Sequence, residues 1–252
     1  MRLLPRRLEH GEEATLVEHL GELRARLIVS LLALAAGFAV AYGFHDRILH
    51  WLNRPLPPHQ RKPVTLSPIE PFTTSIWISL WAGLLLALPI VFWQLWSFLA
   101  PAIEEHRQRS IAVLVAFATV LGLGGVVFGY YVILPPAIHF LTNYDDKHFL
   151  HLIKASTYYS FVVTVLLGIV IVFQLPLVVL GLVALGVLSS RTLRRHRRIG
   201  YFVTAVIALA LPGPDPVTTF LELLPMWALF EASIWVAVAF ERRQPAPSEA
   251  VG

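Results

Sequence analysis

A series of long apolar stretches restricts what this chain can fold into. The first covers residues 27–44, which are 18 consecutive residues without a charged side chain. Mainly apolar stretches follow at residues 76–100, 111–134, 161–188, 199–211 and 220–240. In lipid every backbone polar group needs a partner within the protein, so apolar runs of about 18 residues or more can cross only as helices. The sequence therefore predicts an all-α integral membrane protein with six transmembrane helices.

The composition of the chain agrees with a membrane location and excludes several other classes. Of its 252 residues, 56% are hydrophobic and 14% are charged, whereas charged residues make up about a quarter of a typical soluble protein. The basic residues lie in loops between apolar stretches, so the net charge of +4 gives no indication of nucleic-acid binding. The lack of cysteine excludes disulfides, Cys-ligated zinc and thiol catalysis. We predict one transmembrane domain over residues 1–244 and a disordered tail at residues 245–252.

The two final apolar stretches differ from the others in length. A helix over residues 199–211 would be about 20 Å long, which is shorter than a hydrocarbon core of about 30 Å. The sequence PGPDP at residues 212–216 cannot remain helical. We therefore predict two short final helices joined by a tight turn. Asp215 lies in this turn, where it either caps the following helix or has a functional role.

The distribution of Lys and Arg predicts the orientation of the chain. With six spans, the side that holds both termini carries 14 of these residues and the other side carries six. Positive residues accumulate on the cytoplasmic side of membrane proteins. We therefore predict that both termini are cytoplasmic.

An amphipathic helix, predicted over residues 15–26, leads into the first apolar stretch. Leucines recur in it at helical spacing, while Glu18, Glu22 and Arg26 follow one another four residues apart on another face. One interpretation is an anchor helix that lies in the membrane interface. The alternative is an acidic site for a cationic partner, since two neighbouring guanidinium groups need carboxylates for bidentate pairing.

Gln174 and Glu231 are polar residues predicted to lie at membrane depth. Gln174 precedes Pro176 in a stretch that this proline bends, so its amide can bond to freed backbone groups or to a facing helix. An ionised carboxylate such as that of Glu231 costs about 3 kcal/mol in lipid unless it is paired, protonated or facing water. It therefore indicates a helix contact or the lining of a wet groove. These two residues leave a small-solute or ion transporter open as an alternative function.

The motifs of the common enzyme classes are absent from the sequence. It contains no HExxH, GxSxG or P-loop pattern. Its ten histidines are scattered mainly in loops, and no third ligand accompanies His148 and His151, which could share a helix face. We therefore predict no enzyme activity, no catalytic residue, no metal site and no cofactor.

Six short motifs follow one another along nearly the whole chain. They are HLGELRARL at residues 19–27, SPIEPF at 67–72, QLWSFLAPAI at 94–103, FQLP at 173–176, PGPDP at 212–216 and LFEASI at 229–234. None of them is specific alone. Their order, together with the basic run before residue 199, resembles the TatC family, the multi-spanning subunit of the twin-arginine protein translocase.

The resemblance implies an architecture, a function and a set of partners. The architecture would be a cupped arrangement of six helices in the prokaryotic cytoplasmic (inner) membrane, with both termini in the cytoplasm. The function would be that of a receptor and scaffold that binds twin-arginine signal peptides of folded proteins and exports them with the proton-motive force. TatA-like and TatB-like single-span proteins would be partners, and copies of the chain could associate within the assembly.

The resemblance also assigns candidate residues for binding the signal peptide. In the family the glutamate of the first motif helps to bind the arginine pair, and Glu22 occupies that position here, with His19 and Arg24 in the same motif. Further candidates come from the end of the second apolar stretch and the loop after it: Phe98, Pro101, Glu104 and Glu105.

Two glutamates of the family pattern are missing from their usual positions. Arg107 stands where a second cytoplasmic glutamate is usual, so Glu104 or Glu105 would have to supply that carboxylate. Gln174 stands where the family has a glutamate beside the proline of the fourth span. The side chain of Gln174 can still form hydrogen bonds at that position, but it carries no charge.

Overall fold

The computed structural model describes residues 16–99, 110–144, 148, 152–210 and 216–242. All regular elements in these residues are helices, and a single β-bridge joins Val64 to Lys154. The chain divides into two compact units, which we describe separately: Met1–Trp51 with Leu66–Thr119, and Leu52–Thr65 with Val120–Gly252. The prediction of one domain over residues 1–244 stays a prediction.

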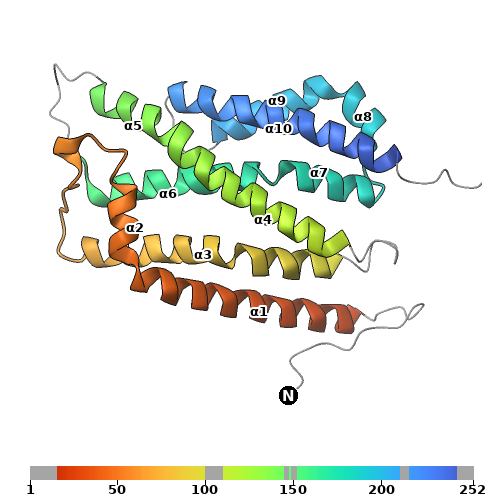
Figure 1. Ribbon diagram of the computed structural model, residues 1–252, viewed down its shortest axis with the longest axis horizontal. Helices are drawn as coiled ribbons and strands as arrows, with labels where there is room; N and C mark the ends of the chain where they lie inside the picture. The colour runs from red at the N-terminus through yellow and green to blue at the C-terminus, as the bar shows by residue number, and fades with distance from the viewer. Residues whose placement is uncertain (1–15, 100–109, 145–147, 149–151, 211–215, 243–252) are drawn as a thin grey trace, which may run out of the picture. The chain divides into compact units, whose positions relative to one another are not determined.

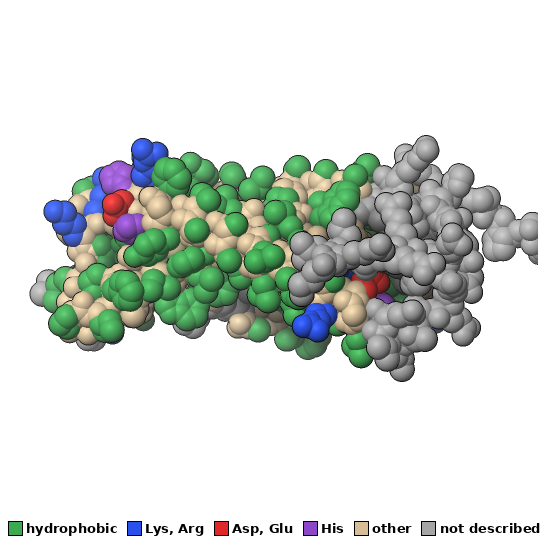
Figure 2. Space-filling model, turned by 90° about the horizontal axis from the view of Figure 1, so that it is seen from below, with side chains coloured by type: hydrophobic (Ala, Val, Ile, Leu, Met, Phe, Trp, Pro, Cys, Tyr) green, Lys and Arg blue, Asp and Glu red, His purple; other side chains and the backbone are tan. Residues whose placement is uncertain are grey.

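Five of the described helices are long and apolar enough to cross a membrane. They cover His19–Gly43, Glu70–Phe98, Ala112–Asn143, Ala155–Ala184 and Pro216–Glu241. In the face drawn in Figure 2, hydrophobic side chains cover the middle, and the charged side chains lie towards the two ends. The chain is therefore an all-α integral membrane protein, as predicted. The remaining predicted span, residues 199–211, corresponds to α9 (Arg197–Ala210), a helix of 14 residues.

In the first unit, α1 (Leu16–Gly43) and α3 (Glu70–Leu99) run antiparallel, side by side (Figure 1). α1 is continuous, so residues 16–26 extend the membrane helix and do not form a separate helix in the interface, which was one interpretation. The reason is that this segment has no proline and is rich in Leu, Glu, Arg and Ala, which favour helix whether they face water or lipid.

Two glycines bring α1 and α3 into backbone contact. A Cβ atom added to Gly83 of α3 would lie 2.5 Å from the backbone nitrogen of Phe38 in α1. A Cβ atom added to Gly37 of α1 would in turn meet the backbone of Gly83. Small residues allow this kind of close approach between membrane helices, where dispersion contacts replace a hydrophobic driving force.

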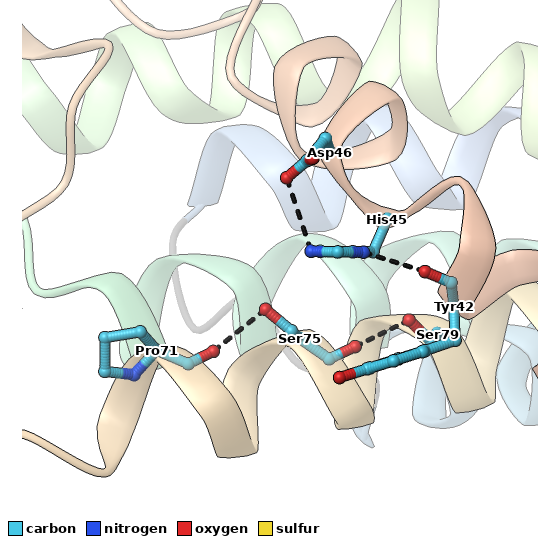
Figure 3. Close-up of polar contacts among 6 residues, drawn as sticks. All are labelled: Tyr42, His45, Asp46, Pro71, Ser75 and Ser79. Atoms are coloured by element: carbon cyan, nitrogen blue, oxygen red, sulfur yellow. Dashed lines mark hydrogen bonds and ion pairs between the residues drawn. The ribbon is translucent and has the colours of Figure 1, made fainter.

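The connection after α1 is fixed by a histidine. His45, the first residue of α2 (His45–Leu52), donates a hydrogen bond from Nδ1 to the carbonyl oxygen of Tyr42, at 2.7 Å (Figure 3). Its Nε2 lies 3.3 Å from Oδ1 of the exposed Asp46. The imidazole therefore stabilises the turn between the two helices.

The hydroxyl groups near the start of α3 are satisfied within their own helix. Ser75 donates to the carbonyl oxygen of Pro71 at 2.9 Å, and Ser79 donates to that of Ser75 at 2.7 Å (Figure 3). A polar group in lipid costs free energy unless it is hydrogen-bonded. These internal bonds remove that cost, so the serines need no partner from outside the unit.

The third membrane helix, which passes from the first unit into the second at Val120, is longer than predicted. α4 (Ser110–Phe128) continues through a π-helical turn, Gly129–Ile133, into α5 (Leu134–Asn143). The predicted span over residues 111–134 stopped at Pro135 and Pro136. The helix continues because these prolines occupy the first turn of α5, where no backbone N–H is required and the preceding π turn accommodates the ring.

The fourth membrane segment is interrupted as predicted. α6 (Ala155–Val172) and α7 (Leu175–Ala184) are separate helices, joined at Phe173 and Gln174. α6 also packs closely on α4, because a Cβ atom added to Gly125 would lie 3.1 Å from the Cα atom of Val170. The glycines of the third span therefore allow the close approach that their spacing predicts.

Two buried tyrosines of α6 bind the end of α2 and the segment after it. This segment contains a short 3₁₀ turn, Pro58–Gln60. Tyr158 donates its hydroxyl to the carbonyl oxygen of Leu52 at 2.6 Å, and Tyr159 donates to Oδ1 of Asn53 at 2.9 Å. Backbone bonds of 2.8 Å from Val64 to Ile153 and from Ala155 to Val64 support the same connection. This segment is therefore tied to the start of α6.

Replacing Tyr158 with phenylalanine should test this connection. The change leaves the Leu52 carbonyl without its side-chain donor and is expected to cost about 1–2 kcal/mol of stability, or about 2–4 °C in unfolding temperature per kcal/mol. Thermal unfolding in detergent measures the shift. Tyr144→Phe is the matched control, because Tyr144 is 65% exposed. Equal shifts for the two variants would contradict an anchoring role.

The last part of the chain comprises α8 (Ser190–Arg195), α9 and α10 (Pro216–Arg242), and α9 lies along α10 (Figure 1). The prediction of two short final helices needs correction, since α10 has 27 residues and α9 alone is short. α10 starts at Pro216, four residues before the predicted start. A proline at the first helical position lacks only an N–H that would have no helical partner, so it begins the helix instead of preventing it.

Candidate functional site

Glu22 forms a half-buried ion pair within α1. Its Oε1 accepts hydrogen bonds from Nε of Arg26 at 2.9 Å and from Nη2 at 2.5 Å. The side chains of Glu22 and Arg26 are 18% and 19% exposed, respectively. The pair follows from the four-residue spacing seen in the sequence. It leaves Oε2 of Glu22 without a hydrogen bond from the residues that the structure describes.

His19 and Phe98 stack on each other, although they are far apart in the sequence. Their ring centroids are 4.6 Å apart, with an angle of 25° between the ring planes. Glu22 follows His19 by three residues on α1, so both lie on one face of the helix. The structure therefore brings three predicted residues, His19, Glu22 and Phe98, to the same end of the α1–α3 pair.

The other predicted residues of this site are not part of that cluster. Arg24 is exposed, and it lies about 200° around the helix from Glu22. Pro101, Glu104 and Glu105 lie outside the described residues, as does Arg107. A contribution of this loop to the site stays a prediction.

The cluster has the chemistry of a cation-binding site. A guanidinium forms strong, charge-assisted hydrogen bonds with a carboxylate and stacks on aromatic rings. Glu22 offers a carboxylate oxygen that bonds to no described residue, and the His19–Phe98 stack offers ring faces and edges nearby. The described residues contain no group of three or more His, Cys, Asp or Glu side chains that could hold a metal ion.

Glu231 of α10 is bound on both carboxylate oxygens by residues of α9. Nη2 of Arg197 lies 3.2 Å from Oε2, and the hydroxyl of Tyr201 donates to Oε1. This arrangement favours the helix contact among the roles that the sequence left open for Glu231. From the sequence, Arg197 counts only as a loop charge, and no prediction includes Tyr201. Their spacing of four residues at the start of a short helix was the available signal.

Gln174 has a backbone contact near the break between α6 and α7. Its Nε2 donates to the carbonyl oxygen of Val170 at 3.5 Å, which is a long hydrogen bond. A bond to the backbone of the interrupted helix is one of the roles predicted for it. Asp215 lies outside the described residues, so its predicted role is not tested.

Comparison with known proteins identifies a family for this chain. Residues 18–225 match the family described as Sec-independent protein translocase protein (TatC). A protein of that name from Carboxydothermus hydrogenoformans is 33% identical over 224 residues, which cover 88% of this chain and 92% of that protein. The Sec-independent protein translocase protein TatCd of Bacillus subtilis is 32% identical over 233 residues, covering 92% and 95% of the two chains.

Solved structures give the same result. The crystal structure of the twin arginine translocase receptor TatC is similar to this chain, with a TM-score of 0.76 and 31% sequence identity. The similarity covers 89% of this chain and 100% of that one. A second crystal structure of the receptor, in the detergent DDM, has a TM-score of 0.77.

Proposed function

Because the chain belongs to the TatC family of Sec-independent protein translocase proteins, we propose that it is the subunit that receives twin-arginine signal peptides. The observation that carries this proposal is the position of Glu22 beside the stacked rings of His19 and Phe98. One arginine of the signal peptide would bond to Oε2 of Glu22, which bonds to no described residue. Its guanidinium plane would lie against the aromatic pair.

The second arginine of the signal peptide needs a second carboxylate. We assign this role to Glu104 or Glu105, which follow α3 closely in the sequence. Arg26 already occupies one oxygen of Glu22, so Glu22 alone cannot pair with two further guanidinium groups in bidentate fashion.

Export would require other subunits. Cavities of 360 and 370 Å³ within the second unit are far smaller than a folded protein. TatA-like and TatB-like single-span proteins, and further copies of this chain, are the partners that family membership supports. Transport of folded cargo would use the proton-motive force. The chain would lie in the prokaryotic cytoplasmic membrane with both termini cytoplasmic, as the excess of positive residues on that side favours.

The substitution Glu22→Gln tests the signal-peptide site. It removes the charge but keeps a side chain that can still accept a bond from Arg26. We expect photo-crosslinking to a signal peptide, labelled beside its arginine pair, to fall about tenfold, because an ionised hydrogen-bond partner is lost from a water-poor site. Asp46→Asn is the matched control, since it removes the same charge from a side chain that is 91% exposed, in α2.

Two further measurements complete this experiment. A signal peptide with two lysines in place of the arginines should crosslink weakly to the unchanged protein, because lysine lacks the planar donor fork. Thermal unfolding should show that Glu22→Gln remains folded at the temperature of the assay, although weakening its pair with Arg26 makes it somewhat less stable than Asp46→Asn. Undiminished crosslinking of a stable Glu22→Gln variant would contradict the assignment of Glu22.

A further inference from the structure

Four exposed arginines lie close together in the sequence at the junction of α8 and α9. Arg191, Arg194, Arg195 and Arg198 are all exposed. Arg191, Arg194 and Arg195 follow the spacing i, i+3 and i+4, so they lie on one side of α8. Arg198 lies in the first turn of α9, just after the turn at His196. We call this set the arginine face.

The arginine face lacks acidic partners within the described part of the chain. None of its four side chains forms a hydrogen bond or ion pair with another described residue, whereas the neighbouring Arg197 is bound to Glu231. Like charges three and four residues apart on a helix destabilise it. The arrangement therefore carries an unfavourable free energy that an anionic ligand would remove.

The backbone beneath these arginines is held in place. The side chain of Ser189 caps α8 by accepting a hydrogen bond from the backbone N–H of Thr192 at 3.1 Å. The backbone N–H and hydroxyl of Ser190 both donate to the carboxylate of Glu241, near the end of α10. A fixed backbone lowers the entropic cost of assembling several arginines around one ligand.

The position of the arginine face along the chain predicts that it lies at the boundary of the membrane. It directly precedes the apolar part of α9, whose exposed side chains include Phe202 at 69% and Leu209 at 73%. With 14 residues, α9 is about 21 Å long, less than a hydrocarbon core of about 30 Å. Because arginine is costly in the hydrocarbon core, we expect the charged start of this helix at the depth of the lipid headgroups.

An apolar opening adjoins the arginine face on α9. It has a volume of 370 Å³ and is lined by Tyr201, Trp227, Ala228 and Glu231. Arg198 precedes Tyr201 by one helical turn. The charge of Glu231 is offset by Arg197, so the opening does not repel an anion strongly. Tyrosine and tryptophan are the side chains that favour the region just below the headgroups.

From these observations we propose that the arginine face binds the headgroup of an anionic phospholipid. Arginine pairs with phosphate oxygens in bidentate fashion, and clustered basic residues next to a membrane helix attract anionic lipids. The opening beside Tyr201 and Trp227 would receive the glycerol end and the first part of an acyl chain. A free phosphate ion lacks the apolar portion that this opening would hold.

The experiment uses the full chain, purified in a neutral detergent and mixed with phosphatidylglycerol or phosphatidylcholine. Native mass spectrometry counts the lipid molecules that remain bound. The test variant changes all four arginines of the arginine face to glutamine. The control removes four exposed cations elsewhere with Arg47→Gln, Arg54→Gln, Arg61→Gln and Lys62→Gln. Both variants have the same net charge.

We expect the unchanged protein to retain phosphatidylglycerol over phosphatidylcholine. Retention of phosphatidylglycerol should fall about tenfold or more in the test variant and less than twofold in the control. Inorganic phosphate at millimolar concentration should not displace the lipid. Equal losses in the two variants would show general attraction between charges and overturn the proposal, as would full displacement by phosphate or unchanged retention in the test variant.

Folding of the test variant is checked separately. Its unfolding temperature in neutral detergent without phosphatidylglycerol should equal or exceed that of the unchanged protein, because the four side chains have no partners among the described residues and their mutual repulsion is removed. Added phosphatidylglycerol should raise the unfolding temperature of the unchanged protein and the control but not of the test variant. A test variant that phosphatidylglycerol stabilises as strongly as the unchanged protein would contradict the proposed site.

Discussion

Replacing Gly83 with leucine is expected to prevent α1 and α3 from packing together. The new Cβ atom would lie 2.5 Å from the backbone nitrogen of Phe38, and 2.7 Å from its Cα atom. A side chain in the way can rotate, whereas backbone can move only if the two helices separate. Excess volume in a core usually costs about 1–3 kcal/mol, and separation of the helices along their contact adds to this cost. A total stability of about 5–15 kcal/mol leaves little reserve.

The measurement is the fraction of protein recovered as a single monodisperse species in detergent, followed by thermal unfolding of that species. We expect Gly83→Leu to yield little or no such protein, and Gly83→Ala to be impaired less. Gly21→Leu is the matched control, because a Cβ atom there meets nothing within 4 Å. It should be as stable as the unchanged protein or more so, since leucine is the better helix former. Normal recovery of Gly83→Leu would mean that α1 and α3 do not cross at this glycine.

The membrane helices could be predicted from the sequence because lipid leaves few alternatives. A run such as residues 27–44 satisfies its backbone in a bilayer only as a helix. The break in the fourth span was also visible, since Pro176 removes a backbone donor inside an apolar run. In both cases a local and strong physical constraint decided the outcome.

The ends of the helices could not be predicted in the same way. Pro135 and Pro136 were expected to stop the third span, but the π turn before them allows the helix to continue to Asn143. Polarity was also a poor guide at the start of α1, because a helix keeps its hydrogen bonds as it passes from water into lipid. Such boundaries depend on backbone geometry more than on composition.

The candidate site was predictable only where its parts are close in the sequence. The pairing of Glu22 with Arg26 follows from helical spacing. The stacking of His19 on Phe98 depends on how α1 packs against α3, for which no local pattern exists. The partners of Glu231 were missed for the same reason, since Arg197 and Tyr201 come from another helix.

Replacing Arg197 with glutamine is expected to destabilise the contact between α9 and α10. The substitution leaves the carboxylate of Glu231, which is 29% exposed, with Tyr201 as its remaining partner among the residues that the structure describes. Removing one member of a buried ion pair costs about 3–5 kcal/mol, whereas exposed pairs contribute about 0–1 kcal/mol. Arg197 is 41% exposed, so we expect about 2 kcal/mol, which corresponds to roughly a 30-fold change in the ratio of folded to unfolded protein.

A double-mutant cycle separates the ion pair from other effects of the substitution. Glu231→Gln removes the charge but keeps an oxygen that can accept the hydrogen bond from Tyr201, so it should cost less than Arg197→Gln. The double variant should be more stable than Arg197→Gln alone, because no unpaired carboxylate remains at the membrane. Arg198→Gln is the matched control, since this neighbouring arginine has no partner among the described residues and its loss should leave stability in neutral detergent unchanged.

The order of these stabilities distinguishes two roles for Glu231. If the carboxylate mainly holds α9 against α10, its energetic coupling to Arg197 should be at least about 1 kcal/mol. In the Glu231→Gln variant, replacing Arg197 with glutamine should then cost little further stability. If the carboxylate instead acts with other groups, the two single effects will add, and the double variant will be the least stable of the set. Next to the ion pair, Gly200 of α9 packs closely against the ring of Phe230 in α10. This packing keeps the two helices at the distance that the ion pair spans, and it therefore favours the first outcome.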